Sequence, residues 1–331
     1  MVQKTGFMLI GAVLAALALG APAAAQKQIL ALVVKGLDNP FFTVLGDGCA
    51  FWNEENPEAD YDCAYTGPMS GADETGQVRI VEELIDAGVA GIAISPANAP
   101  AMAAMLREKQ PSIPVITIDA DLDEADRELR RIYLGTDSYE MGVVMAEYLK
   151  WLKPGGGTLC LQLGNESAEN LNARARGLRD DLAGEAGIQR LDGEGGWTEI
   201  EGCPLYSHDQ SDLANQQLAE ILSANPELDA LVLVGGWAQF DPQAYARVTD
   251  PVMDRLAAQE LIIIAGDALP RQIEALRAGR SHIQIGQHPF EMGYRAPEVL
   301  IELIRGRPVD DPLHTGLDEC SAETMDFCVT E

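Results

Sequence analysis

The sequence predicts an α/β protein built from two doubly wound domains, each with a parallel sheet covered by helices on both faces. The chain has 331 residues, about the length of two ordinary domains. Short, continuously apolar segments alternate with longer segments in which apolar residues recur at helical spacing, and such apolar runs are typical of strands buried on both faces. The alternation runs through one series and starts again after residue 151, which indicates two sheets.

The first series begins with the uncharged run Ile-Leu-Ala-Leu-Val-Val at residues 29–34, which predicts a buried strand. The helix expected at 73–87 follows from Val78, Val81 and Ile85, which fall on one helical face. The further strands expected in this series end at 64–65 or span 92–94, 115–118 and 132–134, and the further helices span 41–54, 99–109 and 139–151.

The second series repeats the pattern with equally apolar strands. Its expected strands are 158–163, 228–234, 261–265 and 283–286, and its expected helices are 168–182, 212–222, 242–256, 271–278 and 290–304. Ligands of open α/β sheets bind at the carboxyl ends of the strands, so the residues just after each strand are the candidates for a site. These segments are 35–39, 95–98, 119–121, 164–166, 235–237, 266–268 and 287–288, and they combine acids and amides with aromatic residues.

Charge and motifs exclude several classes of function. The chain has 23 Lys and Arg against 52 Asp and Glu, a formal net charge of −29, so it has little material for a face that binds nucleic acid or an anionic membrane. The sequence has no nucleophile elbow, no phosphate-binding loop, no dinucleotide fingerprint and no histidines at metal-ligand spacing. We therefore expect no enzymatic activity, no cofactor and no metal site.

Residues 1–25 are expected to form a signal peptide that is removed on export. Lys4 precedes an apolar run at residues 7–19, and three consecutive alanines at 23–25 supply a cleavage site. The alternative is a membrane anchor, but the apolar run is shorter than the roughly 20 residues that span a bilayer. The mature protein is therefore expected to be soluble and exported.

The six cysteines are Cys49, Cys63, Cys160, Cys203, Cys320 and Cys328, and all follow the expected signal peptide. An even number in an oxidising compartment favours disulfides, although six cysteines allow 15 pairings. Proximity in the sequence favours Cys320 with Cys328 and Cys49 with Cys63, which leaves Cys160 with Cys203. Buried free thiols are the alternative.

Several segments together resemble the periplasmic sugar-binding proteins of ABC importers, the ribose- and galactose-type type I group. The segments are the strand at 29–34 with Asp38-Asn39-Pro40-Phe41-Phe42, Pro114 to Asp119, Leu134 to Asp137, Ala173-Arg174-Ala175-Arg176-Gly177, Ile264 to Asp267, and Ile285 to Gln287. The resemblance implies type I periplasmic binding protein architecture, in which two doubly wound parallel-sheet lobes are joined by a three-segment hinge. The implied lobes are 26–136 with 288–315, and 137–287 with 316–331.

The resemblance also implies a set of ligand-binding residues in the cleft. Carried over by position, Asn39, Asp119, Arg176, Asp267 and Gln287 would hydrogen-bond ligand hydroxyls, and Phe41 and Phe42 would pack on the apolar face of the ligand. The chemistry is suitable, because a hydroxyl both donates and accepts and can pair with carboxylates, amides and a guanidinium. Aromatic rings match the C–H patches of a sugar.

Each of these residues has a structural alternative. Asn39 is also placed to cap the helix that Pro40 opens. The two adjacent phenylalanines cannot share one helical face, so one is expected in the cleft and the other in the core. Asp119 and Asp267 also suit turns, and Arg176 is also explained as a solvated charge on an amphipathic helix.

Departures from the ribose-type pattern bear on the ligand. Ala120 stands where those proteins have arginine, Gly236-Trp237 stand where they have Asn followed by Asp, and the aromatic residue near Asp209 is missing. Trp237 is expected to stack on the ligand, with a core or lid residue as the alternative, and Gly236 joins it in the expected site. The loss of arginine and the gain of tryptophan favour a neutral monosaccharide or sugar alcohol.

The sequence thus predicts a monomeric solute-binding protein that passes its ligand to an ABC permease in the inner membrane. A monomer is expected because a hinge that opens needs the lips of its cleft free. One alternative is a sensory protein that presents a sugar or signal molecule to a chemoreceptor or kinase. A secreted enzyme is the second alternative, disfavoured by the missing motifs.

Overall fold

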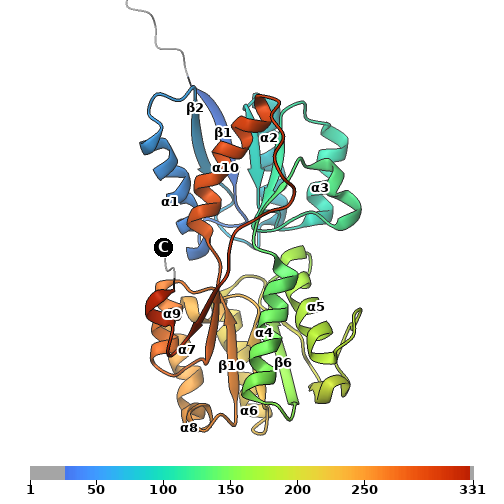
Figure 1. Cartoon of the computed structure of the whole chain (residues 1–331), viewed down its shortest axis with the longest axis vertical. Coiled ribbons are helices and arrows are strands. Elements are labelled where there is room, and N and C mark those ends of the chain that lie inside the picture. The colour runs from blue at the N-terminus through green and yellow to red at the C-terminus, as the bar shows by residue number, and fades with distance from the viewer. Residues whose placement is uncertain (1–26, 329–331) are drawn as a thin grey trace, which may run out of the picture.

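The structure is a computed structural model that describes residues 27–328. The expected signal peptide at 1–25 therefore lies outside the described residues. Figure 1 shows two α/β lobes, one above the other, with the chain crossing between them three times. None of the helices in the described part of the chain is long and apolar enough to cross a membrane.

The N-terminal lobe contains a six-stranded sheet with strand order β12-β5-β4-β3-β1-β2. All of its strand pairs are parallel, as the apolar runs predict. The strands are β1 (Gln28–Val33), β2 (Tyr61–Thr66), β3 (Gly91–Ile94), β4 (Val115–Ile118), β5 (Tyr133–Gly135) and β12 (Leu313–His314).

The C-terminal lobe contains a seven-stranded sheet with strand order β13-β11-β10-β9-β6-β7, and β8 also pairs with β6. Only the edge strand β13 is antiparallel to its neighbour. The strands are β6 (Gly157–Leu163), β7 (Trp197–Glu199), β8 (Leu205–Tyr206), β9 (Ala230–Leu233), β10 (Ile262–Gly266), β11 (Ile283–Gly286) and β13 (Asp318–Ser321). The sequence did not predict β7, β8, β12 and β13, because each is too short to show an apolar run.

Helices cover both sheets, and all but one lie within two residues of their expected limits. The helices are α1 (Pro40–Glu55), α2 (Glu74–Ala87), α3 (Ala99–Lys109), α4 (Ser138–Leu152), α5 (Glu169–Ala183), α6 (Ser211–Ala224), α7 (Pro242–Thr249), α8 (Met253–Ala257), α9 (Pro270–Arg277) and α10 (Pro289–Ile304). The single helix expected at 242–256 is wrong. A 3₁₀ turn at Asp250–Val252 separates α7 from α8, since Pro251 lacks the N–H that an α-helix requires there.

Local sequence signals set the start of α1 and both ends of α2. Asn39 caps α1 by accepting a hydrogen bond from the Phe41 N–H at 2.9 Å, and Pro40 follows at the first helical position. Asp73 caps α2 through the Gly76 N–H, and Gly88 ends that helix in the left-handed conformation at φ 74°. The three crossings lie between β5 and α4, between β11 and α10, and between β12 and β13.

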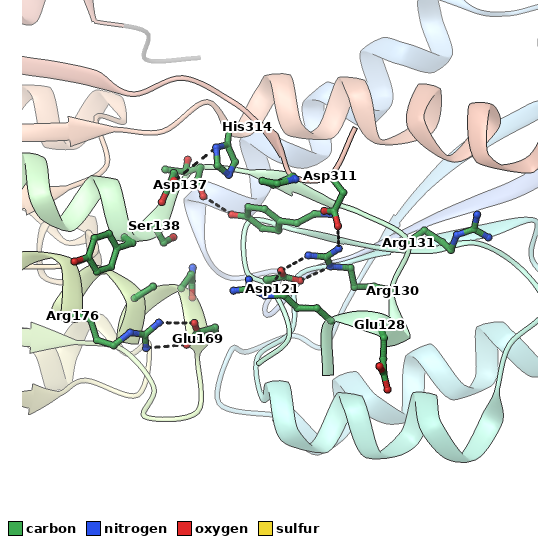
Figure 2. A pocket seen from close by; sticks show the side chains of 17 residues that line it. Asp121, Glu128, Arg130, Arg131, Asp137, Ser138, Glu169, Arg176, Asp311 and His314 are labelled. Carbon is green, nitrogen blue, oxygen red and sulfur yellow. Dashed lines mark hydrogen bonds and ion pairs between the residues drawn. The ribbon is translucent and has the colours of Figure 1, made fainter. Parts of the chain in front are cut away.

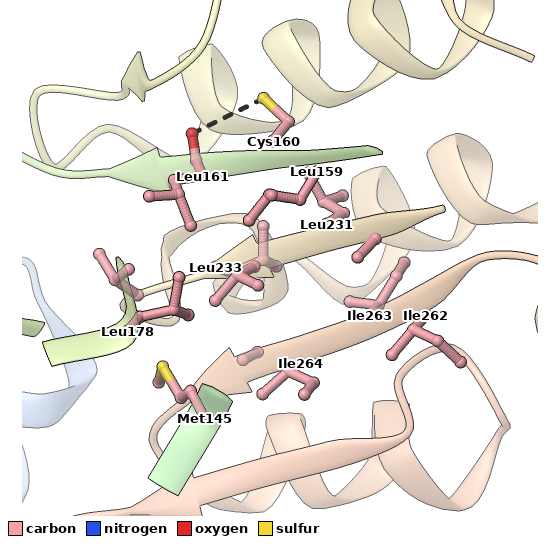
Figure 3. Close-up of a cluster of buried hydrophobic side chains, with 14 of the residues drawn as sticks. Met145, Leu159, Cys160, Leu161, Leu178, Leu231, Leu233, Ile262, Ile263 and Ile264 are labelled. Carbon is pink, nitrogen blue, oxygen red and sulfur yellow. Dashed lines mark hydrogen bonds between the residues drawn. The ribbon is translucent and has the colours of Figure 1, made fainter. Parts of the chain in front are cut away.

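The larger apolar core lies in the C-terminal lobe, where side chains from neighbouring strands and helices interdigitate (Figure 3). Leu161 on β6, Leu233 on β9 and Ile264 on β10 are completely buried. Met145 of α4 and Leu178 of α5 belong to the same cluster. Burial of one such side chain contributes about 1.5–3 kcal/mol, so this core holds the strand ends in fixed positions.

In each lobe one pair of helices packs backbone against backbone at facing glycines. A Cβ at Gly142 of α4 would lie 2.0 Å from the Arg174 carbonyl oxygen, and one at Gly177 of α5 would lie 2.1 Å from the Tyr139 carbonyl oxygen. The N-terminal lobe repeats the arrangement, with Gly48 of α1 and Gly293 of α10. These contacts fix the distance of α5 from α4 and therefore the position of the side chains that α5 presents.

Three disulfides join the six cysteines, so the expectation of disulfide bonds is confirmed. The pairs are those that proximity favours: Cys49–Cys63, Cys160–Cys203 and Cys320–Cys328. Their Cα–Cα distances are 5.7, 5.4 and 6.1 Å, within the range that disulfides need.

Candidate functional site

A small cavity of about 30 Å³ lies between the lobes at the carboxyl ends of both sheets. All but one of the nine expected ligand-binding residues line it: Asn39, Phe41, Phe42, Asp119, Gly236, Trp237, Asp267 and Gln287. Sequence reasoning missed four polar residues that also line it, namely Lys35, Asn170, Arg174 and Asp209. Both lobes and the hinge segment at Gln287 thus contribute to one site.

A hydrogen-bonded chain of three side chains forms the hinge side of the cavity. The Gln287 amide donates to Asp267 Oδ1 at 2.6 Å and accepts from Arg174 Nη2 at 2.9 Å. Arg174 Nη1 also donates to the Val234 carbonyl oxygen at 2.8 Å. Burial raises the pKa of Asp267, whereas Arg174 and the Gln287 amide oppose that rise. The chain fixes a guanidinium and a carboxylate beside each other where a ligand would meet both.

Arg176 does not reach this cavity. Arg174 and Arg176 are two residues apart on α5, so they point to nearly opposite sides of the helix. The side chain of Arg174 is almost completely buried, while Arg176 is partly exposed and forms an ion pair with Glu169 at 2.8 Å. The A-R-x-R-G resemblance therefore pointed to Arg176, whereas Arg174 of the same segment lines the cavity, and the alternative of a surface charge describes the position of Arg176.

Arg176 instead lines a larger pocket of about 660 Å³ beside the hinge, shown in Figure 2. Several charged groups in this pocket are paired with one another. Arg130 pairs with Asp121 at 2.8 Å and also with Asp311, and these pairs are drawn at the centre of Figure 2. Because Arg130, Asp121 and Asp311 satisfy one another at its centre, this pocket is a weaker candidate for the ligand than the smaller cavity.

The Asp119 end of the cavity is tied across the lobes. Asp119 Oδ2 accepts from the Ser95 hydroxyl at 2.6 Å and lies 3.3 Å from Lys35 Nζ. Asn170, on the opposite lobe, accepts from Lys35 Nζ at 3.1 Å and donates to Asp119 Oδ1 at 3.4 Å. A further cross-lobe hydrogen bond joins Asn165 to Glu74.

Asn39 and the two phenylalanines after it all lie at the cavity. Asn39 both caps α1 through its Oδ1 and lines the cavity, so the capping alternative and the site placement hold together. Phe41 and Phe42 both line the cavity, with ring centroids 5.3 Å apart and planes at 87°. The expectation that only one would face the cleft is wrong, because the first turn of α1 begins at the cavity wall.

Two glycines at the site allow close contacts with the side chains of Trp237, Asp209 and Gln272. A Cβ at Gly164, just after β6, would lie 2.0 Å from Asp209 Oδ1 and 2.6 Å from the Trp237 ring. A Cβ at Gly236 would lie 1.9 Å from Gln272 Nε2. These close approaches explain why the site needs glycine at both positions.

Three buried polar atoms from the cavity residues have no hydrogen-bond partner within the part of the chain that the structure describes: Asp209 Oδ1, Arg174 Nε and Trp237 Nε1. The three aspartates of the cavity also have left-handed backbones, with φ of 63° at Asp119, 59° at Asp209 and 70° at Asp267. Such strain is common at binding sites, and buried polar atoms normally have partners. The cavity therefore offers two donors and an acceptor to a ligand.

Asp209 is a buried carboxylate of the cavity with a raised pKa. Burial, with Asp119 and Glu74 nearby, raises its pKa to about 6, against the opposing charges of Lys35 and His208. Between about pH 4 and pH 6, the folded protein therefore keeps a proton on Asp209 that the unfolded chain, with a pKa of about 3.9, has released.

We expect the stability that the protonated Asp209 confers to fall as pH rises from 4 to 6 and to be lost above pH 6, by about 3 kcal/mol at most. Thermal unfolding of the wild type and of Asp209→Asn at pH 4.5 to 7.5 measures the effect. The wild type should lose melting temperature relative to the variant with rising pH. Asp212→Asn, at an exposed position nearby, serves as the control; identical pH profiles for wild type and Asp209→Asn would contradict the prediction.

The four cavity residues that sequence reasoning missed differ in how clearly the sequence indicates their position. Lys35 stands directly after the first strand, in a segment that the strand-end rule identifies. Arg174 lies in the A-R-x-R-G segment itself. Asp209 follows β8, a two-residue strand with no detectable pattern, and Asn170 lies in the first turn of α5. No group of three or more acidic, histidine or cysteine side chains in residues 27–328 could hold a metal ion.

Comparison with known proteins identifies relatives along nearly the whole chain. The chain is 23% identical to the ribose import binding protein of Salmonella typhimurium over 91% of this chain and 94% of that one. It is 27% identical to the D-ribose/D-allose-binding protein of Pseudomonas aeruginosa, in a match that covers 62% of each chain, less than two thirds of that relative. An ABC transporter solute-binding protein from Agrobacterium vitis with bound D-fucose superposes with a TM-score of 0.79 at 19% identity, covering 90% of this chain and 97% of that one.

A family model described as the periplasmic binding protein domain matches residues 30–308. The matched segment includes both sheets apart from the first two residues of β1 and the edge strands β12 and β13. The family consists of binding proteins rather than enzymes and works outside the cytoplasm, in agreement with the expectation of no enzymatic activity. The fold and the matched model together show that the chain belongs to the periplasmic binding protein family.

Proposed function

We propose that the protein binds a neutral monosaccharide or sugar alcohol in the cavity between the lobes. The observation that carries the proposal is the set of unpartnered buried atoms there, Asp209 Oδ1, Arg174 Nε and Trp237 Nε1. A hydroxyl can donate to the carboxylate and accept from the guanidinium or indole, so one polyhydroxyl ligand can satisfy all three. Phe41 and Phe42 add apolar rings for its C–H surface.

Neutrality follows from the charges that line the cavity. Lys35 and Arg174 face Asp119, Asp267 and Asp209, and the raised pKa of Asp209 allows it to be protonated near pH 6. A ligand with a net charge would upset this balance in a site that excludes most water. Relatives support the same class, since one is a ribose import binding protein and solved structures of similar proteins hold D-fucose or D-arabinose.

The mechanism is closure about the hinge. The N-terminal lobe supplies Asn39 and the phenylalanines, the C-terminal lobe supplies Trp237 and Arg174, and Gln287 lies on a crossing segment. A ligand that touches all of them is held fully only when the lobes meet, so binding shifts the open–closed equilibrium to the closed state. The closed protein then differs in shape from the open one, which a partner can recognise.

The proposed partner is an ABC permease of the inner membrane, with the protein acting as a periplasmic monomer. Import is supported over sensing by the relatives, because one is a ribose import binding protein and another is an ABC transporter solute-binding protein.

The test is a thermal-shift screen of the mature protein against pentoses, hexoses, sugar alcohols, amino acids and small organic acids. A ligand at 100 times its dissociation constant should stabilise the protein by about 2.7 kcal/mol. Asp267→Asn and Trp237→Ala should lose the response, while Trp151→Ala, which changes an exposed tryptophan 70% accessible to solvent, should keep it. A response only to amino acids or organic acids would refute the sugar assignment.

A further inference from the structure

Lys35 is a charged residue of the cavity that is not among the proposed ligand contacts. Lys35 lies two residues after the end of β1 and is 5% exposed, although lysine is seldom buried without a partner. Its ammonium group lies 3.3 Å from Asp119 Oδ2 on its own lobe and donates to Asn170 Oδ1 on the opposite lobe at 3.1 Å. The side chain therefore spans one end of the cavity from wall to wall.

The protein's own groups occupy the Asp119 carboxylate. Ser95, Lys35 and Asn170 approach its two oxygens at 2.6, 3.3 and 3.4 Å. A carboxylate offers about four lone-pair positions, so little capacity is left for ligand hydroxyls at this end. In this chain, Asp119 thus acts through Lys35 and Asn170 in holding the lobes together.

The unpartnered atoms lie on the other lobe. Asp209 Oδ1, Arg174 Nε and Trp237 Nε1 all belong to the C-terminal lobe. A ligand that satisfies them therefore lies against the C-terminal wall, opposite the lobe that carries Lys35. The whole cavity measures about 30 Å³, so the space that the Lys35 side chain occupies limits the size of what can bind.

We propose that Lys35 determines the size of the ligand, so that the site accepts four- and five-carbon polyols and pentoses in preference to hexoses. The inference rests on the proposed function and specifies its substrate class. A hexopyranose carries one hydroxymethyl group more than a pentopyranose. To place that group at the Asp119 end, the ligand would have to displace the ammonium and leave a buried carboxylate without its charged partner, which is strongly unfavourable.

Two substitutions separate the size of Lys35 from its charge. Lys35→Ser removes three non-hydrogen atoms, slightly more than a hydroxymethyl group contains, whereas Lys35→Met removes the charge and fills nearly the same space. Lys27→Ser is the matched control, because Lys27 lies at the opposite end of β1 and pairs with Asp62 at 3.0 Å on the surface.

Isothermal titration of the four proteins with erythritol, ribitol, D-ribose, D-arabinose, D-allose, D-galactose and D-glucitol tests the proposal. The wild type and Lys27→Ser should bind their best four- or five-carbon ligand at least ten-fold more tightly than any six-carbon one. Lys35→Ser should bind the six-carbon ligands at least ten-fold more tightly than the wild type does, and Lys35→Met should show no such gain.

Equal wild-type affinities for pentoses and hexoses would overturn the assignment of Lys35, whether or not the variants fold, and would leave the proposed function intact. An equal gain in Lys35→Met and Lys35→Ser would also overturn it, because charge rather than size would then be decisive. If the folded wild type bound none of these compounds, the proposed function would fail and the inference with it.

Discussion

Replacing Arg174 with methionine is expected to weaken ligand binding by on the order of 100-fold, equivalent to about 2.7 kcal/mol. The guanidinium donates to Val234 and Gln287 and holds a further N–H toward the cavity. Hydrogen bonds to a charged group contribute about 1.5–3 kcal/mol each, so the loss of the ligand contact and of the positioned Gln287 accounts for the effect.

The same substitution is expected to lower the free energy of unfolding by about 3 kcal/mol. The buried carboxylate of Asp267 would lose the cation that opposes the rise of its pKa, and removal of one partner of buried charged groups is strongly destabilising. Titration calorimetry and urea unfolding measure the two effects separately. A variant that binds normally would show that Arg174 serves only the fold.

Arg176→Met provides the matched control on the same helix. Its guanidinium forms an exposed ion pair with Glu169, and such pairs contribute about 0–1 kcal/mol. We expect ligand affinity within about three-fold of the wild type and a change in stability below about 1 kcal/mol. Loss of binding in this variant instead of Arg174→Met would reverse the assignment of the two arginines.

A second large effect on stability is expected from Gly142→Ala. Alanine is the better helix former by about 1 kcal/mol, so propensity alone predicts stabilisation. The new Cβ would nevertheless lie 2.0 Å from the Arg174 carbonyl oxygen, and backbone cannot yield as a flexible side chain does. We expect a net loss of about 2–3 kcal/mol, because overpacking forces α4 and α5 apart.

Gly142→Ala should also weaken ligand binding, since the displaced backbone carries Arg174. Gly155→Ala is the control: its Cβ would have no atom within 4 Å, and stability should change by less than about 0.5 kcal/mol. Chemical unfolding of both variants measures these two changes in the free energy of unfolding. If Gly142→Ala were as stable as Gly155→Ala, the two helices would not depend on the close contact.

The sequence correctly predicted the alternation of strands and helices because that alternation depends on residues close in the chain. The apolar run at 29–34 forms β1, and the cap at Asn39 with Pro40 begins α1. Where local signals conflict, the prediction fails, as at Pro251, which interrupts a helix that the apolar spacing favours. Strands of two residues, such as β8, contain too few positions for a period to show.

The residues of the candidate site were likewise predicted only in part from the sequence. Strand-end position and family resemblance place Asp267, Trp237 and Gln287 at the cavity, because the carboxyl ends of parallel strands meet at one edge. The choice between Arg174 and Arg176 depends on which side of α5 packs on the sheet, and a two-residue shift in the motif reverses the answer.

By itself the sequence determined the class of fold, the two sheets, the disulfide-forming cysteines and most of the cavity residues, since each follows from local pattern or from position at a strand end. Only the tertiary structure decided which charges meet. Lys35 and Asn170 are 135 residues apart, and their contact exists because two separately folded lobes close on each other. The energy of a buried charge depends on the partners around it, and those partners come from distant segments whose approach no local pattern records.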